Sequence, residues 1–242
     1  MKISYGTDVG IIRNDNQDSV SYREFSENCG LFVVADGMGG HRGGKTASSI
    51  AVETITHVFF ENYTQQMRSE EIKELLRHAV NIANTQIFEK SDSDEELYGM
   101  GTTVVVLFVC DNTLYTASVG DSRAYVFNGN RAHQITTDHS LVADLLSRGI
   151  ISEEEAKNHP QKNVITRAVG SEPSLTVDVF QTNLDSDNII VGCSDGLYSM
   201  VSEEEIAVII NDNIENSAEK LIKLANERGG QDNITVVVAK IS

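Results

Sequence analysis

The chain has 242 residues, a length that suits one large domain able to bury its own core. Its hydrophobic fraction of 40% and charged fraction of 23% are those of an ordinary globular protein. The formal net charge of −17 repels nucleic acid and anionic lipid, which argues against direct binding to either.

The sequence carries no sign of export or membrane insertion. The N-terminal stretch MKISYGTDVG lacks the apolar core of a signal peptide, and no apolar run approaches the roughly 20 residues that span a bilayer. Cys29, Cys110 and Cys193 show no CxxC spacing, so we expect buried, reduced thiols. These features predict a cytoplasmic protein.

The first half of the chain predicts two strands, two long helices and a β-meander. Residues 3–9 and 30–35 have strand character, and apolar residues recur at helix spacing over about 45–62 and 70–89. Four strand-like runs follow at 102–110, 113–119, 122–127 and 131–136. The turns between these runs are too short for a crossover, so the runs must pair antiparallel.

The second half predicts a mixed segment and then a closing strand. Short helices are expected at 141–148 and 153–158, strands at 176–181 and 188–193, and helices at 202–211 and 217–228. The last strand is expected at 234–241. With two prolines and no low-complexity linker, residues 1–242 are interpreted as one domain, in which helical pairs enclose antiparallel sheets.

A glycine-rich stretch raises the alternative of a nucleotide-binding protein. GGHRGGKT, from Gly39 to Thr46, satisfies the phosphate-loop pattern GxxxxGK[ST]. A phosphate-loop NTPase needs a parallel sheet built from strand–helix–strand units. The predicted antiparallel meander therefore argues against this interpretation.

Four aspartates fall at the ends of predicted strands: Asp36, Asp121, Asp195 and Asp232. Turn chemistry explains any one of them, because aspartate and glycine favour turns for local reasons. If the four side chains converge, their repulsion calls for a divalent cation, and oxygen ligands favour Mg²⁺ or Mn²⁺. Arg13 is the best candidate for gripping a phosphate, because its guanidinium is planar and permanently charged.

Taken together, the motifs resemble the metal-dependent protein phosphatases of type 2C (the PPM family), especially the bacterial members. The resemblance runs from residue 13 to residue 235 and implies an α+β fold, a four-layer αββα sandwich of two antiparallel β-sheets flanked by helix pairs. The matching stretches occur in the family's order: RNDNQD, VVADGMGGH, GMGTT, VGDSR, TTDHS, HPQKNVITRAVG, CSDGL and GGQDNIT.

The resemblance also implies roles for residues. Asp36 would bridge two Mn²⁺ or Mg²⁺ ions, Asp195 and Asp232 would complete the first site, and the Gly37 carbonyl would bind the second ion. These roles place a binuclear metal site at the rim of the sheets.

Three further roles follow from the same motif matches. Asp121 resembles the residue that holds a third, weaker ion in bacterial members. Asp18 resembles a carboxylate that reaches the metals through water, and Arg13 would hold the substrate phosphate. Residues 147–169 correspond to a flap that overhangs the site, and we hypothesise that it shapes substrate choice.

The activity that the resemblance implies is hydrolysis of phosphoserine and phosphothreonine in proteins by a hydroxide that bridges the two metals. The expected partners are phosphorylated proteins, including a cognate bacterial serine/threonine kinase and its substrates, in a signalling role. We expect a monomer, with no nucleic acid and no membrane insertion. A non-catalytic relative that binds phosphoprotein is the alternative, and the intact Arg13, Asp36, Asp195 and Asp232 favour the enzyme. A phosphatase dedicated to one phosphoserine regulator would share the same chemistry.

Two positions depart from the pattern. Animal members carry a histidine after the Asp-Gly, where it is proposed to protonate the leaving group, and this chain has Met38 there. His41 is the nearby candidate for a general acid, with a solvated loop histidine as the competing interpretation. Gln17 stands where many relatives carry a glutamate before Asp18, which would weaken the second metal.

Overall fold

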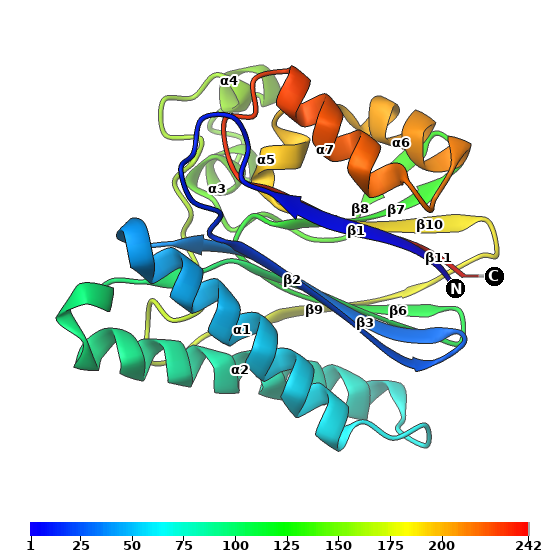
Figure 1. The fold of residues 1–242 in the computed structure, drawn as a ribbon, viewed down its shortest axis with the longest axis horizontal. Helices are drawn as coiled ribbons and strands as arrows, with labels where there is room; N and C mark the ends of the chain where they lie inside the picture. Colours follow the sequence, from blue (N-terminus) through cyan, green and yellow to red (C-terminus); the bar gives the residue numbers. More distant parts are fainter. Residues whose placement is uncertain (242) are drawn as a thin grey trace.

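The protein is a four-layer sandwich. The computed structural model describes residues 1–241, apart from the side chains of His41 and Lys157. Two antiparallel sheets pack face to face, and helices cover the outer face of each (Figure 1). The predicted α+β fold with an αββα layer order is confirmed.

One sheet has the strand order β1-β11-β10-β7-β8, and the two ends of the chain supply its neighbouring strands β1 and β11. Its strands are β1 (Lys2–Asp8), β7 (Arg123–Asn128), β8 (Arg131–Gln134), β10 (Asn188–Cys193) and β11 (Ile234–Lys240).

The other sheet has the order β2-β3-β5-β6-β9, with a short strand β4 (Gly101–Thr102) paired to β3. Every strand pairing within residues 1–241 is antiparallel, which removes the parallel sheet that a phosphate-loop NTPase requires. The remaining strands are β2 (Asp18–Ser26), β3 (Cys29–Met38), β5 (Val104–Cys110), β6 (Thr113–Val119) and β9 (Asp178–Asn183).

Long helices cover the second sheet. In α2, the buried positions Ile72, Leu76, Ala79, Ala83 and Ile87 recur every three or four residues and form one apolar stripe. Burial of each large apolar side chain contributes about 1.5–3 kcal/mol, so packing rather than helix propensity holds the helices in place. The two helices on this side are α1 (Gly40–Asn62) and α2 (Ser69–Ser93), followed by a 3-10 turn (Glu95–Leu97).

Shorter helices cover the first sheet, and a third apolar cluster fills the space between the sheets. Phe32, Leu107 and Ile190 belong to that middle cluster and are almost fully buried. The covering helices are α5 (Asp195–Tyr198), α6 (Glu203–Asp212) and α7 (Ser217–Glu227). Among the described residues, no helix combines the length and apolarity needed to cross a membrane.

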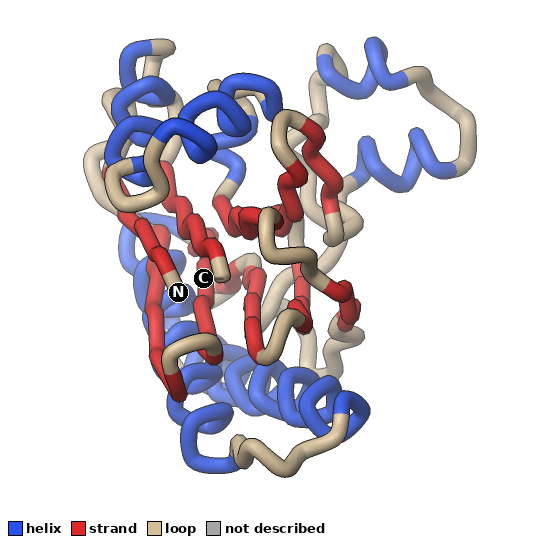
Figure 2. Tube along the Cα trace, turned by 90° about the vertical axis from the view of Figure 1, so that its right-hand side faces the viewer, coloured by secondary structure: helices blue, strands red, loops and turns tan. Residues whose placement is uncertain are grey.

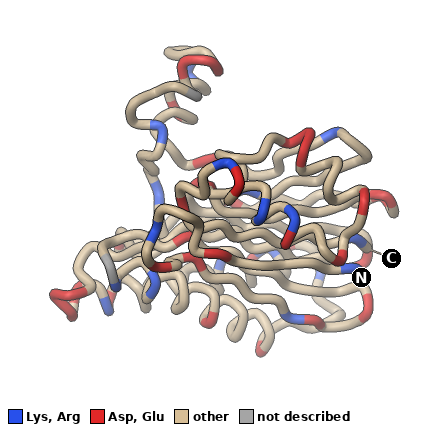
Figure 3. The backbone as a smooth tube through the Cα atoms, turned by 45° about the horizontal axis from the view of Figure 1, so that its top comes forward, with Lys and Arg blue, Asp and Glu red and all other residues tan. Residues whose placement is uncertain are grey.

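Two short helices, α3 (Leu141–Ser147) and α4 (Glu153–Lys157), form an excursion that stands out from the sandwich (Figure 2). This excursion contains most of the predicted flap. Acidic residues are distributed over all layers of the molecule rather than gathered on one face (Figure 3). The large negative charge is therefore a general surface property.

Several elements differ from those expected. Strand β2 was not predicted, because its sequence DSVSYREFS is rich in polar residues and lacks a regular alternation of apolar and polar positions. Helix α1 begins at Gly40 rather than near residue 45. The expected start was later because Gly40, Gly43 and Gly44 have low helix propensity. Strand β9 is shifted from the predicted 176–181, since its pairing with β6 sets its limits.

Candidate functional site

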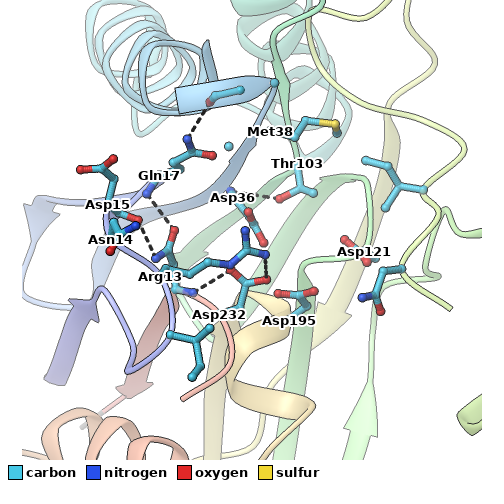
Figure 4. Close-up of a pocket in the computed structure, with 17 residues that line it drawn as sticks. Arg13, Asn14, Asp15, Gln17, Asp36, Met38, Thr103, Asp121, Asp195 and Asp232 are labelled. Atoms are coloured by element: carbon cyan, nitrogen blue, oxygen red, sulfur yellow. Dashed lines mark hydrogen bonds and ion pairs between the residues drawn. The ribbon is translucent and has the colours of Figure 1, made fainter. Parts of the chain in front are cut away.

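A pocket of about 570 Å³ opens where β3, β11 and the segments after β6 and β10 come together. Four aspartates from distant parts of the sequence point into it (Figure 4). The predicted convergence of Asp36, Asp121, Asp195 and Asp232 is therefore observed. Arg13 and the backbone of Gly37 also line the pocket.

Asp36 lies near the end of the buried strand β3, where the neighbouring segment fixes its backbone. The Thr103 amide donates to the Asp36 carbonyl at 2.8 Å, and the Asp36 amide donates to the Thr103 hydroxyl oxygen at 3.1 Å. The pKa of Asp36 is raised well above its usual range, first by burial and then by the charges of Asp18 and Asp195. A cation bound among these carboxylates would offset their mutual repulsion.

At Gly37, helix α1 packs closely against strand β3. A Cβ atom on Gly37 would lie 2.0 Å from the carbonyl oxygen of Gly44, and one on Gly44 would lie 2.7 Å from the carbonyl oxygen of Gly37. Only two facing glycines permit this approach. The glycine-rich stretch therefore serves packing around the Gly37 carbonyl.

Lys45, the lysine of the phosphate-loop pattern, is engaged elsewhere. Its ammonium donates to the carbonyl oxygen of Asp18 at 2.8 Å and to the hydroxyl of Ser19 at 3.2 Å. In this arrangement Lys45 holds the start of β2 beneath the pocket. The match to GxxxxGK[ST] is coincidental.

Asp195 follows β10 and forms the first residue of α5. Its Oδ1 atom is buried and has no hydrogen-bond partner. Burial, followed by the charges of Asp121 and Asp232, raises the pKa of Asp195 to about 7. A buried acceptor without a donor is the kind of group that a cation satisfies.

Asp121 sits in the turn after β6, and its residue is 8% exposed. Burial, then the charge of Asp138, raises the pKa of Asp121 to about 6. The Tyr198 hydroxyl donates to the Asp121 carbonyl at 3.1 Å, and the guanidinium of Arg123 lies 3.7 Å from the centre of the Tyr198 ring. Arg123 also forms an ion pair with Asp138. Contacts from Tyr198 and Arg123 therefore stabilise this turn.

Asp18 is fully buried beneath the pocket. Its Oδ2 atom accepts hydrogen bonds from Ser194 at 2.7 Å and from Thr235 at 2.6 Å, whereas Oδ1 has no partner. Burial raises the pKa of Asp18 to about 6, although these two hydroxyls favour the charged form. Asp18 therefore lies beneath the carboxylates that line the pocket, where it can support them.

Arg13 and Asp232 form an ion pair at 2.7 Å (Figure 4). The Arg13 side chain is 55% exposed and lies on a loop before β2. Asp232 precedes β11, so the first and last parts of the chain meet at this edge of the pocket. The side chain of His41, the candidate general acid, lies outside the described residues.

The residues fit a cluster of divalent cations in their chemistry. The acidic groups supply hard oxygen donors, which Mg²⁺ and Mn²⁺ prefer, and the raised pKa values report repulsion that a cation would cancel. Within the described part of the chain, no three acidic, histidine or cysteine side chains already form a ready site. The carboxylates share one pocket without closing on a single point.

Sequence reasoning missed the groups that hold these carboxylates. The Ser194 and Thr235 hydroxyls donate to the Asp18 carboxylate. The Thr103 hydroxyl accepts from the Asp36 amide, and the Tyr198 hydroxyl donates to the Asp121 carbonyl. Each lies within a motif already singled out or just beyond it, as in GMGTT and CSDGL. Their place in or beside these motifs was the available signal that they belong to the site, although it did not show which aspartate each one contacts.

The root of the predicted flap is tied to the same region. Asn163 and Ile165 line the pocket. Buried His139 accepts a hydrogen bond at Nδ1 from the Gly120 amide and lies 3.2 Å from Asp178, which also pairs with Arg167. The flap and the Asp121 turn are thus connected through one polar network.

Comparisons with known proteins agree with this geometry. Residues 13–235 match the family model described as Protein phosphatase 2C. The chain is 40% identical over 242 residues to the serine/threonine phosphatase stp of Listeria welshimeri, covering 99% of this chain and 96% of the relative.

Solved structures give the same result. The S. agalactiae serine/threonine phosphatase superposes with a TM-score of 0.92 at 36% identity, covering 99% of each chain. The catalytic domain of the phosphatase PstP in complex with two manganese ions superposes with a TM-score of 0.85 at 31% identity, covering 99% of this chain and 97% of that one. The chain therefore belongs to the protein phosphatase 2C family.

Proposed function

We propose that Asp36, Asp195, Asp232 and the Gly37 carbonyl hold two divalent ions in the pocket of this protein serine/threonine phosphatase. The observation that carries the proposal is the meeting of three carboxylates and one close-packed carbonyl in a single pocket beside an arginine. Mn²⁺ and Mg²⁺ both suit these oxygen donors. The PstP relative with two manganese ions supports this choice.

When bound, the two ions supply a nucleophilic hydroxide near neutral pH and offset charge on the phosphoryl oxygens. The chain's own residues then bind and orient the substrate. Arg13 turns from Asp232 to the substrate phosphate and grips two of its oxygens. We propose direct hydrolysis, without a phosphorylated enzyme.

Asp18 and its two hydroxyl partners act as a support for the metal ligands. Because Ser194 and Thr235 donate to one oxygen of Asp18, the other oxygen stays directed away from them and accepts from water near the ions. Asp121 is proposed to hold a third, weaker ion, because it lines the same pocket and its charge helps to raise the pKa of Asp195. His41 is kept as the candidate proton donor to the leaving oxygen.

Residues 147–169 are proposed to act as a flap over this site within one domain that spans 1–242. This proposal rests on Asn163 and Ile165, because both residues belong to the segment and line the pocket. An apolar and an amide side chain there would contact residues next to the phosphorylated one. Exchange of this segment with that of a relative should change peptide preference, and an unchanged preference would remove the flap from substrate choice.

The biological partners follow from this chemistry. The substrates are phosphorylated proteins, and we propose that a cognate serine/threonine kinase and its targets are among them, in a bacterial cytoplasm. The relatives named as bacterial serine/threonine phosphatases support this role. We propose that the protein acts as a monomer.

The experiment is phosphate release from a phosphothreonine peptide with Mn²⁺, compared with the same assay in EDTA and with ATP as a parallel substrate. We expect metal-dependent release from the peptide and no turnover of ATP. Peptide left intact despite bound metal would instead indicate a phosphoprotein-binding role.

A further inference from the structure

Two cysteines lie directly opposite each other at the end of the sheet that is remote from the pocket. Cys29 is the first residue of β3 and Cys110 is the last residue of β5, and the two are register partners. Asp36 lies further along β3, roughly 20 Å away at about 3.3 Å per residue. The pair is therefore separate from the phosphatase site.

The register determines how the two side chains face each other. The Thr103 amide donates to the Asp36 carbonyl in the same register, and hydrogen-bonded pairs recur at every second position of an antiparallel ladder. Along the two strands, the Cys29–Cys110 pair lies an odd number of residues from the Asp36–Thr103 pair. Cys29 and Cys110 therefore form a non-hydrogen-bonded pair of the ladder. Such pairs have Cα atoms about 4.5 Å apart, within the range of about 4.4–6.8 Å that a disulfide spans.

The hydroxyl of Tyr63 contacts both sulfur atoms. The Tyr63 hydroxyl, just after α1, lies 3.3 Å from the Cys110 sulfur and 3.6 Å from the Cys29 sulfur. Cys29 is 2% exposed, whereas Cys110 is only half-buried and can meet small molecules from solvent. One thiol is thus reachable and the other is sheltered behind it.

The hydrogen bonds also activate the reachable thiol. Donation by the Cys29 thiol, opposed by burial and assisted by the Tyr63 hydroxyl, lowers the pKa of Cys110 to about 7. The pKa of Cys29 is raised by the same hydrogen bond and by burial. A thiolate that is partly accessible and has a second thiol beside it is the usual arrangement of a redox-sensing pair.

We propose that Cys29 and Cys110 form a reversible intramolecular disulfide when the protein meets hydrogen peroxide. The Cys110 thiolate attacks one peroxide oxygen, the O–O bond breaks, and hydroxide leaves as Cys110 becomes a sulfenic acid. The Cys29 sulfur then attacks the Cys110 sulfur, the S–O bond breaks, and the hydroxyl leaves as water with the Cys29 proton. In sum, two thiols and one peroxide give one disulfide and two waters.

Cys193 provides an internal control. It is fully buried in β10 of the other sheet, and burial raises the pKa of its thiol to about 12. Such a thiol is inert toward peroxide. Oxidation should therefore consume two of the three cysteines and leave this one.

The test is alkylation of the denatured wild-type protein with N-ethylmaleimide before and after peroxide, followed by intact mass measurement and peptide mapping. We expect three alkylated thiols before treatment and one, Cys193, afterwards, with a mass loss of about 2 Da that dithiothreitol reverses. Three alkylated thiols after treatment would overturn the proposal. So would disulfide-linked dimers, or over-oxidised Cys110 beside a Cys29 that still alkylates.

Variants make the test specific. In Cys193→Ser, peroxide should leave no alkylated thiol, whereas in Cys29→Ser the Cys110 sulfur should be over-oxidised because no partner remains. Tyr63→Phe keeps the ring and removes the donor, so closure should slow by about tenfold near neutral pH as the Cys110 thiolate becomes scarcer. An unchanged closure rate in Tyr63→Phe would remove the phenol from the mechanism.

Discussion

The guanidinium of Arg13 donates to the carboxylate of Asp232 at 2.7 Å across the mouth of the pocket. The pair joins a residue proposed to hold phosphate to a residue proposed to hold metal. Both side chains are partly exposed, at 55% and 34%, so the ion pair contributes little to stability. Metal and substrate can therefore separate the two residues at small cost.

Replacement of Arg13 tests its role on the substrate. In Arg13→Ala, kcat/KM for a phosphothreonine peptide should fall by about 10- to 100-fold, because hydrogen bonds to a charged group are worth about 1.5–3 kcal/mol. Arg42→Ala is the control, since the Arg42 side chain is also exposed, at 78%, and pairs with Glu96 outside the pocket. Equal loss in both variants would assign the effect to overall charge and not to phosphate binding.

Replacement of Asp36 should separate activity from stability. In Asp36→Asn, activity should fall at least about 100-fold, because metal ions contribute several kcal/mol to the transition state. The metal-free variant should nevertheless melt roughly 3 °C higher at neutral pH, since it lacks a charge that burial and the neighbouring Asp18 and Asp195 oppose. Asp187→Asn, at an exposed position, should change neither quantity. A metal-free Asp36→Asn that melts lower would contradict the proposed repulsion.

The carboxylates also predict how stability depends on pH. The pKa values of Asp18 and Asp121 are raised to about 6 and that of Asp195 to about 7, all above the ordinary value of 3.8. For an acid with a raised pKa in the folded state, the stabilisation is fully present below the unfolded pKa and is lost as pH rises through the folded pKa.

The effect of these carboxylates should therefore lower the melting temperature of the EDTA-treated protein as pH rises from about 4 to about 7. Metal affinity should rise over the same interval, because binding requires the ionised carboxylates. Thermal melts and Mn²⁺ titrations at several pH values measure both trends. Mn²⁺ affinity that is flat between pH 5 and 8 would show that these groups do not bind the metal.

The facing glycines give a structural prediction. In Gly44→Ala, the new Cβ would meet the Gln17 Oε1 atom at 2.5 Å and the Gly37 carbonyl oxygen at 2.7 Å, so the carbonyl proposed to bind metal must move. Half-saturation with Mn²⁺ should need at least about tenfold more metal, as is typical when groups that orient a ligand are disturbed.

Gly43→Ala, one position earlier in α1, is the matched control. Its Cβ would contact only the Met100 residue, at 3.0 Å or more. We expect a much smaller change in metal requirement, because this contact is a longer one and does not involve the Gly37 carbonyl. Comparable effects in the two variants would assign the change to helix packing in general.

The sequence predicted the layers of the fold well, because helix and strand periods are local properties. It missed β2, whose polar side chains are ordered by pairing with β3 rather than by their own pattern. The four aspartates could be found from their strand-end positions. The hydroxyls of Ser194 and Thr235 on Asp18 could not, since those contacts join residues 176 and 217 positions apart. The pairing of Arg13 with Asp232 was hidden for the same reason.

The most direct test of the metal centre is the position of bound Mn²⁺ in crystals, located by anomalous diffraction, together with the binding stoichiometry in solution. We predict two strong peaks among Asp36, Asp195, Asp232 and the Gly37 carbonyl, and a weaker third beside Asp121 that disappears in Asp121→Asn. Manganese bound elsewhere on the surface, with the pocket carboxylates still facing one another and Arg13 still on Asp232, would contradict the account.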